Sequence, residues 1–142
     1  MSSIGVIYWS GSGNTQAMAE AIAEGIKSAG AEVDVLTVSQ ISADDALKYE
    51  KIAFGCPSMG AEVLEESEFE PFFEDIENKL TGKKVALFGS YGWGDGQWMR
   101  EWQERTEGKN AMVFDEGLII NETPDSEGIE TCKEFGKKFV SF

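Results

Sequence analysis

The feature that most constrains this chain is a short turn rich in glycine and hydroxyl side chains. Its residues are Ser10, Gly11, Ser12, Gly13, Asn14 and Thr15. An apolar run over residues 4–9 precedes the turn, and an amphipathic helical pattern over residues 15–29 follows it. A strand that enters such a turn at the start of a helix can bind phosphate, because backbone N–H groups and the helix dipole face the anion. The turn therefore predicts a phosphate-binding loop, with a plain capped glycine turn as the structural alternative.

The turn contains no Lys or Arg, which narrows the chemistry. The P-loop pattern is absent because no Lys follows Gly13, and the dinucleotide pattern is incomplete because Gln16 stands where its third Gly belongs. Phosphoryl transfer needs Lys, Arg or a metal ion over the phosphate that is transferred. A neutral loop instead suits a cofactor that is held by its phosphate and reacts at another part of the molecule.

Strand and helix patterns alternate five times along the chain. We predict strands over residues 4–9, 32–38, 52–56, 85–88 and 111–120, the last interrupted by Asp115-Glu116-Gly117. We predict helices over residues 15–29, 42–48, 67–80, 97–107 and 127–139. The spacing Ser67-x-x-Glu70 predicts a capping box at the start of the third helix, with Pro71 in its first turn.

This alternation predicts an α/β fold that occupies residues 1–142 as a single domain. We expect a doubly wound, five-stranded parallel sheet in the order 2-1-3-4-5, covered by helices on both faces as a three-layer sandwich. Ligands of such sheets bind at the carboxyl ends of the strands, at the switch point between strands 1 and 3. Three loops should meet there: residues 10–15, 57–66 and 89–96.

The second and third of these loops have features of a ring-binding site. Tyr91 and Trp93 stand among four glycines in residues 89–96, so the backbone can approach a ligand while the aromatic faces remain available. Trp93 is either a stacking platform or a lid over the edge of the core. In the second loop, Met59 can pack on a ring, and Glu62 can accept a ring N–H or be a solvated surface acid.

Composition excludes several classes of partner. The net charge is −14 with no His, which disfavours nucleic acid, anionic membranes and zinc. The acidity indicates either a basic protein partner or simple solubility. Cys56 and Cys132 lie in apolar patterns and form no CxxC pair, so we expect buried free thiols and a reducing cytoplasm. We expect no signal peptide at residues 1–4 and no membrane span.

Three stretches carry a resemblance to a known family: Tyr8-Trp9-Ser10-Gly11-Ser12-Gly13-Asn14-Thr15, Gly55-Cys56-Pro57-Ser58-Met59-Gly60-Ala61-Glu62 and Gly89-Ser90-Tyr91-Gly92-Trp93-Gly94-Asp95-Gly96. Along essentially its whole length the chain resembles the short-chain flavodoxins, without the insertion in the fifth strand that marks the long-chain branch. The resemblance implies non-covalent FMN that cycles between semiquinone and hydroquinone. It implies a low-potential one-electron carrier that replaces ferredoxin, with no catalytic residue and no metal.

The resemblance also assigns roles to residues. The phosphate contacts implied are Ser10, Gly11, Ser12, Gly13, Asn14 and Thr15. Met59 and Trp93 are implied to pack on the two faces of the ring, and Glu62 to accept from its N3–H. The ring-side contacts implied are Gly60, Ala61, Ser90, Tyr91, Gly92 and Gly94, with the Gly60–Ala61 peptide turning its carbonyl toward N5–H. Pro57 and Ser58 are also included among the cofactor-binding residues.

The chain departs from the family pattern at two positions of the second loop. Pro57 stands where some relatives carry a further hydroxyl, and Ser58 is the residue that could replace it. Ala61 stands where relatives have Asp, Gly or Asn. Because a Cβ resists positive φ, we expect Ala61 to hinder the turning of this peptide.

The acidity acquires a function under this interpretation. Residues 62–77 contain eight acids and no base. We hypothesise that this charge lowers the potential of FMN and steers basic redox partners, such as ferredoxin or flavodoxin reductases and oxidoreductases. We expect a monomer. The alternatives are an FMN-dependent NAD(P)H:quinone reductase of the same fold, and a response-regulator domain, which would need an Asp where Cys56-Pro57 ends the third strand.

Overall fold

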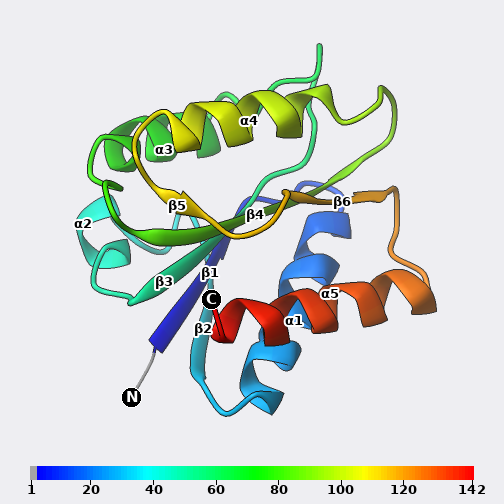
Figure 1. Ribbon diagram of the computed structural model, residues 1–142. Helices are drawn as coiled ribbons and strands as arrows, with labels where there is room; N and C mark the ends of the chain where they lie inside the picture. Colours follow the sequence, from blue (N-terminus) through cyan, green and yellow to red (C-terminus); the bar gives the residue numbers. More distant parts are fainter. Residues whose placement is uncertain (1–2) are drawn as a thin grey trace.

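A computed structural model describes residues 3–142 and contains one parallel sheet (Figure 1). Its strands are β1 (Ser3–Tyr8), β2 (Glu32–Thr37), β3 (Lys51–Gly55), β4 (Lys84–Tyr91), β5 (Met112–Val113) and β6 (Leu118–Asn121). The strand order is β2-β1-β3-β4-β5, and β6 also pairs with β4. The predicted order and parallel pairing are therefore confirmed.

Helices cover both faces of the sheet. They are α1 (Asn14–Ser28), α2 (Ala43–Ala46), α3 (Phe69–Glu77), α4 (Gln97–Glu107) and α5 (Ser126–Val140). Helices α1 and α5 lie together on one face, and α3 and α4 lie on the other (Figure 1). Side chains of a strand alternate between the two faces, so Val6 joins the core under α1 and α5, while Ile7 joins the core under α3 and α4. The three-layer arrangement is confirmed.

The predicted fifth strand is two short strands with a bulge between them. Val113 pairs with Val85, and Leu118 pairs with Phe88, so the four edge residues between these pairs lie opposite only two residues of β4. Asp115 has a φ of 51°, and the Gly117 N–H donates to Gln103 Oε1 of α4 at 3.0 Å. The polar interruption recognised in the sequence is therefore the point where the edge leaves the sheet and bonds to α4 instead.

The predicted capping box of α3 is wrong. Glu65 accepts hydrogen bonds from the N–H groups of Ser67 (2.9 Å), Glu68 (2.8 Å) and Phe69 (2.9 Å), and from the Ser67 hydroxyl. Glu70 instead forms an ion pair with Arg105, at 2.6 Å. A carboxylate four residues before the start of the helix takes the place of the serine, because its longer side chain reaches three backbone donors at once.

Helix α2 is shorter than predicted, and the predicted burial of both cysteines is confirmed. Ser42 does cap α2, since its hydroxyl accepts from the Asp45 N–H at 3.1 Å, but the helix ends at Ala46 rather than Lys48. Cys56 and Cys132 are free and fully buried, as predicted. Burial raises the pKa of both thiols, that of Cys132 to about 12.

Residues 3–142 have two features that bear on membranes and metals. None of the helices there is both long enough and apolar enough to cross a bilayer. The same residues contain no group of three or more acidic, Cys or His side chains placed to hold a metal ion. Residues 1 and 2 of the segment expected to lack a signal peptide lie outside the described residues.

Candidate functional site

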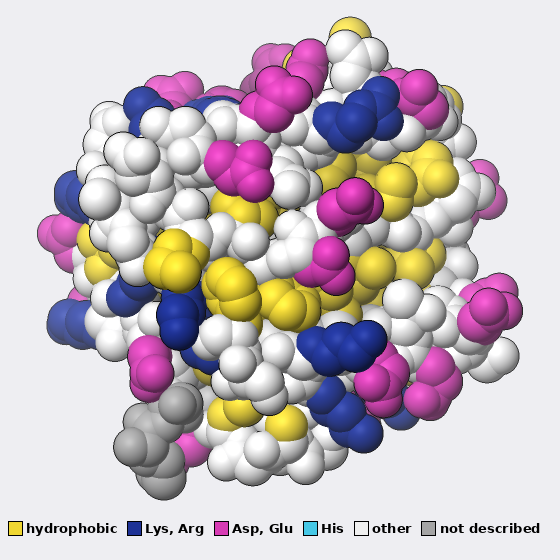
Figure 2. Space-filling view, viewed as in Figure 1, with side chains coloured by type: hydrophobic (Ala, Val, Ile, Leu, Met, Phe, Trp, Pro, Cys, Tyr) yellow, Lys and Arg dark blue, Asp and Glu magenta, His cyan; other side chains and the backbone are white. Residues whose placement is uncertain are grey.

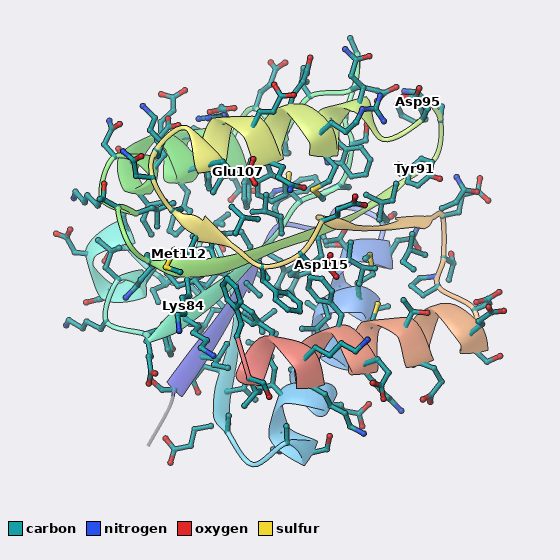
Figure 3. All side chains as sticks on the ribbon, in the orientation of Figure 1. Lys84, Tyr91, Asp95, Glu107, Met112 and Asp115 are labelled. Atoms are coloured by element: carbon teal, nitrogen blue, oxygen red, sulfur yellow. The ribbon has the colours of Figure 1, made fainter. Side chains whose placement is uncertain are left out.

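A cavity of about 590 Å³ lies at the carboxyl ends of β1, β3 and β4. Tyr91 and Asp95 mark this end of β4, and Lys84 marks the opposite end (Figure 3). The structure brings the three predicted loops together here. The predicted residues that line the cavity are Gly11, Ser12, Asn14, Pro57, Ser58, Met59, Ser90, Tyr91, Gly92 and Trp93. The predicted residues that are not part of the lining are Ser10, Gly13, Thr15, Gly60, Ala61, Glu62 and Gly94.

The first loop uses some of its hydroxyls to hold its own shape. Ser10 Oγ accepts the N–H groups of Gly13 (3.1 Å) and Gln16 (3.3 Å). The Thr15 side chain is buried, and its Oγ1 lies 3.0 Å from Ser90 Oγ, which ties the start of α1 to β4. Gly13 has a φ of 95°, which favours glycine, and turns the chain into the helix. The loop thereby presents the remaining residues and the free amides of α1 to the cavity.

Trp9 lines the cavity although sequence reasoning treated it only as the end of a strand. A Cβ added to Gly11 would lie 2.9 Å from Trp9 Cη2, so glycine is needed where the loop crosses the indole. Trp9 Nε1 donates to Glu68 Oε1 at 3.0 Å and links the first loop to the acidic segment. A tryptophan that directly precedes a glycine-rich loop was the available sequence signal.

Glu122 and Thr123 also line the cavity and were missed. Thr123 Oγ1 donates to Asn14 Oδ1 at 2.9 Å, and the Glu122 N–H donates to the Tyr91 carbonyl at 2.7 Å. Glu122 has a φ of 57°, a conformation that is uncommon for residues other than glycine. These residues close the cavity from the sheet edge, and no motif distinguishes them because they follow a short strand of ordinary composition.

The second loop is a tight hairpin. Met59 and Val63 exchange backbone hydrogen bonds of 2.8 and 2.9 Å. Gly60 and Glu62 have positive φ values of 49° and 55°, and Ala61 is not among the positive-φ residues of the described chain. The left-handed residue after Gly60 in this conformation is Glu62, and the expectation that Ala61 hinders the turning of the Gly60–Ala61 peptide stays a prediction.

Ser58 is the polar residue of this loop without a partner. Its N–H donates to the Ser90 carbonyl at 3.0 Å, which joins the loop to β4. The residue is 6% exposed and lines the cavity, and its Oγ has no hydrogen-bond partner among the described residues. A buried hydroxyl left unpaired costs free energy, so an orphan at a cavity wall fits a site where a ligand supplies the partner.

Glu62 lies at the start of α4, beside the cavity lining. Its Oε2 accepts the Trp98 N–H at 3.2 Å, and α4 begins after Gly96, which has a φ of 93°. A Cβ added to Gly94 would lie 1.8 Å from Glu62 Oε1, so glycine is required where the third loop passes this carboxylate. One carboxylate oxygen of Glu62 thus accepts a hydrogen bond from the start of α4, and the other lies near the third loop, at Gly94.

Trp93 stands at the mouth of the cavity with its side chain 58% exposed. Its Nε1 donates to the Gly60 carbonyl at 3.1 Å and joins the second loop to the third. Tyr91 packs against Trp98 with 5.7 Å between ring centroids, so its position is supported by α4. An exposed indole held at a cavity mouth by a hydrogen bond is placed to stack on a planar ligand.

The lining of the cavity contains no basic residue, and some of the acidic residues around it already bind other groups of the protein. Its lining has Glu122 as the one charged residue and no Lys or Arg. Burial alone would raise the pKa of Glu65, but its hydrogen bonds to Ser67, Phe69 and Glu68 bring it below the usual range. The Arg105 guanidinium lowers the pKa of Glu77, which it contacts at 2.8 Å. Of the eight acids in residues 62–77, four therefore serve a helix start or an ion pair: Glu62, Glu65, Glu70 and Glu77.

Comparisons with known proteins agree on one family. The family model described as Flavodoxin matches residues 6–136. A flavodoxin of Clostridium beijerinckii is 52% identical over 96% of this chain and 98% of its own length. A flavodoxin of Megasphaera elsdenii is 49% identical over 93% of this chain and 94% of its own. The solution structure of two-electron reduced Megasphaera elsdenii flavodoxin has a TM-score of 0.88 and covers 98% of this chain and 99% of that one.

Proposed function

Since the chain belongs to the flavodoxin family and is therefore an FMN-binding electron carrier, we propose that the cavity at the carboxyl ends of β1, β3 and β4 holds the FMN. Bound FMN supplies a ring system that accepts and releases single electrons. The chain carries electrons to redox partners and turns over no substrate of its own, so the quinone-reductase alternative is not favoured. The response-regulator alternative is excluded by family membership.

The phosphate end of the site is proposed at the start of α1. Gly11, Ser12 and Asn14 line the cavity there, and the backbone N–H groups of the first turn of α1 face the same region. Ser10, Gly13 and Thr15 support the loop from behind through the hydrogen bonds described above. The observation that carries this assignment is that α1 has no acid in its first turn and receives only the neutral Ser10 hydroxyl there, which leaves its N-terminus available to an anion.

Ser58 is proposed as the additional donor that compensates for Pro57. Proline has no N–H and no hydroxyl, so it cannot contact a phosphate through either group. The Ser58 hydroxyl is next to it in the chain, buried, unpaired and part of the cavity lining. A cofactor oxygen that accepts from this hydroxyl would satisfy the one orphan hydroxyl of the site.

The ring end of the site is proposed between Met59 and Trp93. Both line the cavity, one from each flanking loop, and the hydrogen bond from Trp93 to Gly60 fixes the distance between the two loops. The remaining ring-side groups proposed are the Gly60–Ala61 peptide, Glu62, and the backbone of residues 90–94. In this arrangement the protein excludes water from both faces of the ring and offers Glu62 as an acceptor for a ring N–H.

Removal and rebinding of FMN tests this assignment. We expect Ser58→Ala to weaken FMN binding about five- to tenfold, the usual worth of one hydrogen bond, and to leave riboflavin binding unchanged if the hydroxyl faces phosphate. Ser28→Ala, whose hydroxyl donates to the Gly25 carbonyl far from the cavity, is the matched control. Equal FMN affinities for Ser58→Ala and Ser28→Ala would remove Ser58 from the site. Equal affinities of the parent protein for FMN and riboflavin would remove the phosphate assignment.

The net charge supports two finer proposals about electron transfer. We propose that uncompensated carboxylates near the cavity, including Glu62, Glu68 and Glu122, keep the potential of the bound FMN low by opposing added negative charge. We also propose that the acidic surface steers redox proteins with a basic face, including reductases, to a monomeric carrier in the cytoplasm. Electron-transfer rates with such a reductase should fall as salt rises, and rates independent of salt would contradict the steering.

A further inference from the structure

The outer edge of the sheet is hollowed on both sides. A cavity of about 570 Å³ lies between this edge and α5, and another of about 410 Å³ lies between the same edge and α4. The two cavities share Glu116, Gly117 and Ile119, so the chain between β5 and β6 separates them. Neither cavity shares a lining residue with the proposed FMN site. The edge is therefore a surface feature that the electron-carrier function does not explain.

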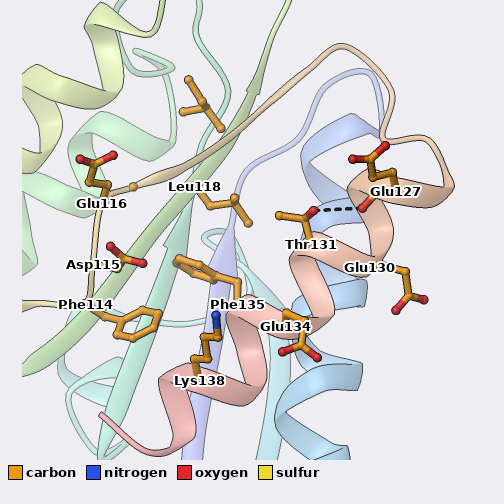
Figure 4. A pocket seen from close by; sticks show the side chains of 12 residues that line it. Phe114, Asp115, Glu116, Leu118, Glu127, Glu130, Thr131, Glu134, Phe135 and Lys138 are labelled. Carbon is orange, nitrogen blue, oxygen red and sulfur yellow. Dashed lines mark hydrogen bonds between the residues drawn. The ribbon is translucent and has the colours of Figure 1, made fainter.

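Both cavities have apolar floors. Phe114 and Phe135 meet edge to face at the base of the α5-side cavity, with 5.2 Å between ring centroids, and Leu118 lies beside them (Figure 4). Met99 and Ile119 contribute apolar surface to the α4-side cavity. Figure 2 shows the result as an apolar band that crosses this face of the molecule. Side chains of moderate size could bury apolar surface on either side of the edge.

The backbone of the edge offers hydrogen bonds to a further strand. The Glu122 N–H donates to the Tyr91 carbonyl of β4. The backbone groups of successive strand residues alternate in direction. The N–H and C=O groups of residues 118 and 120 therefore also face β4, and those of Ile119 and Asn121 face outward. Among residues 3–142, no strand lies on the outer side of β6. An extended segment could therefore pair with this side, with its successive side chains directed alternately toward the two cavities.

The charge around the edge selects the kind of segment that fits. The α5-side cavity is bordered by Asp115, Glu116, Glu127, Glu130 and Glu134, with Lys138 as its one base (Figure 4). On the other side, Glu104 and Glu107 face a single base, Arg100. A neutral or acidic strand would meet this charge without compensation, whereas Lys or Arg side chains could reach the carboxylates from a strand laid on the apolar floor.

We propose that the β6 edge binds an extended, basic segment of a partner protein, which adds a strand beside β6 and places alternate apolar side chains in the two cavities. A second copy of this chain does not suit the same edge, because each copy carries a net charge of −14 and the edge itself is acidic. The site would anchor a partner outside the FMN cavity, and it does not depend on where the cofactor binds.

The test uses the FMN-loaded protein, labelled with ¹⁵N, and a short lysine–valine peptide that repeats Lys-Lys-Val-Val as the probe, so that each face of the added strand carries both side chains. We expect amide shift changes along β5, β6, α4 and α5, with residues 9–14 and 57–62 unchanged. A peptide with glycine in place of valine keeps the charge, and a peptide N-methylated at every residue loses the backbone donors of both its edges. We expect both to bind at least about fivefold more weakly, since each lacks one of the two required contacts. Equal binding of all three peptides would overturn strand addition.

Charge-reversed variants locate the site. Glu116→Lys and Glu134→Lys should each weaken binding of the lysine–valine peptide about fivefold. The matched control is Glu32→Lys, which makes the same change at an exposed residue of β2, the opposite edge of the sheet. An equal loss in Glu32→Lys would show attraction to net charge alone and overturn the proposal. Concentration-dependent self-association of the parent protein through β6 would also overturn it, because the occupant would then be a second copy.

Discussion

Helices α1 and α4 begin in the same way but are completed differently. Each follows a glycine in the left-handed conformation, Gly13 with a φ of 95° and Gly96 with a φ of 93°, and neither glycine can cap the helix with a side chain. At α4 the protein brings a carboxylate from another loop, since Glu62 accepts the Trp98 N–H. At α1 only the neutral Ser10 hydroxyl reaches the first turn. The start of α4 is closed by the protein, and the start of α1 remains available to an anion.

The other long helices follow the pattern of α4. Glu65 accepts three backbone N–H groups at the start of α3, and Asp125 accepts the Gly128 N–H at 2.7 Å at the start of α5. Negative charge at a helix N-terminus stabilises the helix by about 0.3–1 kcal/mol and more when buried. The chain supplies that charge at three helices and withholds it at the one that enters the cavity. The contrast explains how the proposed phosphate site could hold an anion without Lys or Arg.

Removing the most buried of these carboxylates should have the largest effect. Glu65→Ala leaves three backbone donors of α3 without an acceptor in a region where the side chain is 6% exposed. We expect the free energy of unfolding to fall by about 3 kcal/mol, measured by urea denaturation of the FMN-free protein. Glu66→Ala, at the exposed neighbouring residue, should change it by less than about 0.5 kcal/mol. A similar small loss in both variants would mean that the cap contributes little.

The same carboxylate gives stability a defined pH dependence. Burial would raise the pKa of Glu65, but the hydrogen bonds outweigh it and lower the pKa below the ordinary 4.5. A depressed pKa means that the contribution is complete above the pKa of the unfolded chain and is lost as pH falls through the lower value of the folded protein. Stability should therefore decline below about pH 4.5 in the parent, and the decline should be shallower in Glu65→Gln.

Giving α1 the charge that the other helices have should break the contrast. In Ser10→Asp a carboxylate would stand where a hydroxyl now accepts the Gly13 and Gln16 N–H groups. We expect FMN to bind about thirtyfold more weakly through repulsion of its phosphate, and the FMN-free protein to gain about 0.5 kcal/mol. Ser10→Asn has a similar shape without the charge and is the control. Titrations with riboflavin should not distinguish the two variants, and a loss of equal size for both flavins would place the phosphate elsewhere.

The periodicity of apolar residues in the sequence was sufficient to predict the fold, because the same apolar residues form its core. Strands such as β3 are apolar on both faces, and the helices between them have one apolar face, so a parallel sheet between two helical layers is the arrangement that buries both. Local spacing was less informative at helix starts. Ser67-x-x-Glu70 fits a capping box, but Glu65 outcompetes the serine, and Glu70 turns to Arg105, which is distant in sequence.

The site was predictable where a motif sits on one loop and not where it depends on contacts between loops. The glycines of residues 10–15 and 89–96 identify close approach of backbone, and the structure places both loops at the cavity. The sequence did not identify Thr123, because its role comes from a hydrogen bond to Asn14, more than a hundred residues away in the chain. The ion pairs of Glu70 and Glu77 were not predicted for the same reason, since their partner, Arg105, lies outside residues 62–77.

The two left-handed glycines provide a smaller test of the shared geometry. Gly13→Ala meets no atom within 4 Å, so its cost is the left-handed conformation alone, about 1–1.5 kcal/mol. Gly96→Ala has the same strain and places its Cβ 3.0 Å from Ile119 Cδ1, so it should cost at least as much. Gly92→Ala, which has open space and no positive φ, is the control for both. Urea denaturation of the three FMN-free variants should give this order, and a Gly13→Ala protein as stable as Gly92→Ala would contradict it.

Neutralising the carboxylate at α4 should have the smallest effect and is the most direct test of the contrast. Glu62→Gln keeps an acceptor for the Trp98 N–H but loses the negative charge that interacts with the helix dipole at the start of α4. The FMN-free protein should lose about 0.5 kcal/mol of stability, and the loss should shrink at high salt because screening weakens the charge–dipole interaction. Glu74→Gln, at an exposed residue of α3 beyond its first turn, is the matched control. If Glu62→Gln were as stable as Glu74→Gln at low salt, the carboxylate would not be completing α4, and α1 and α4 would differ only in which of them faces the cavity.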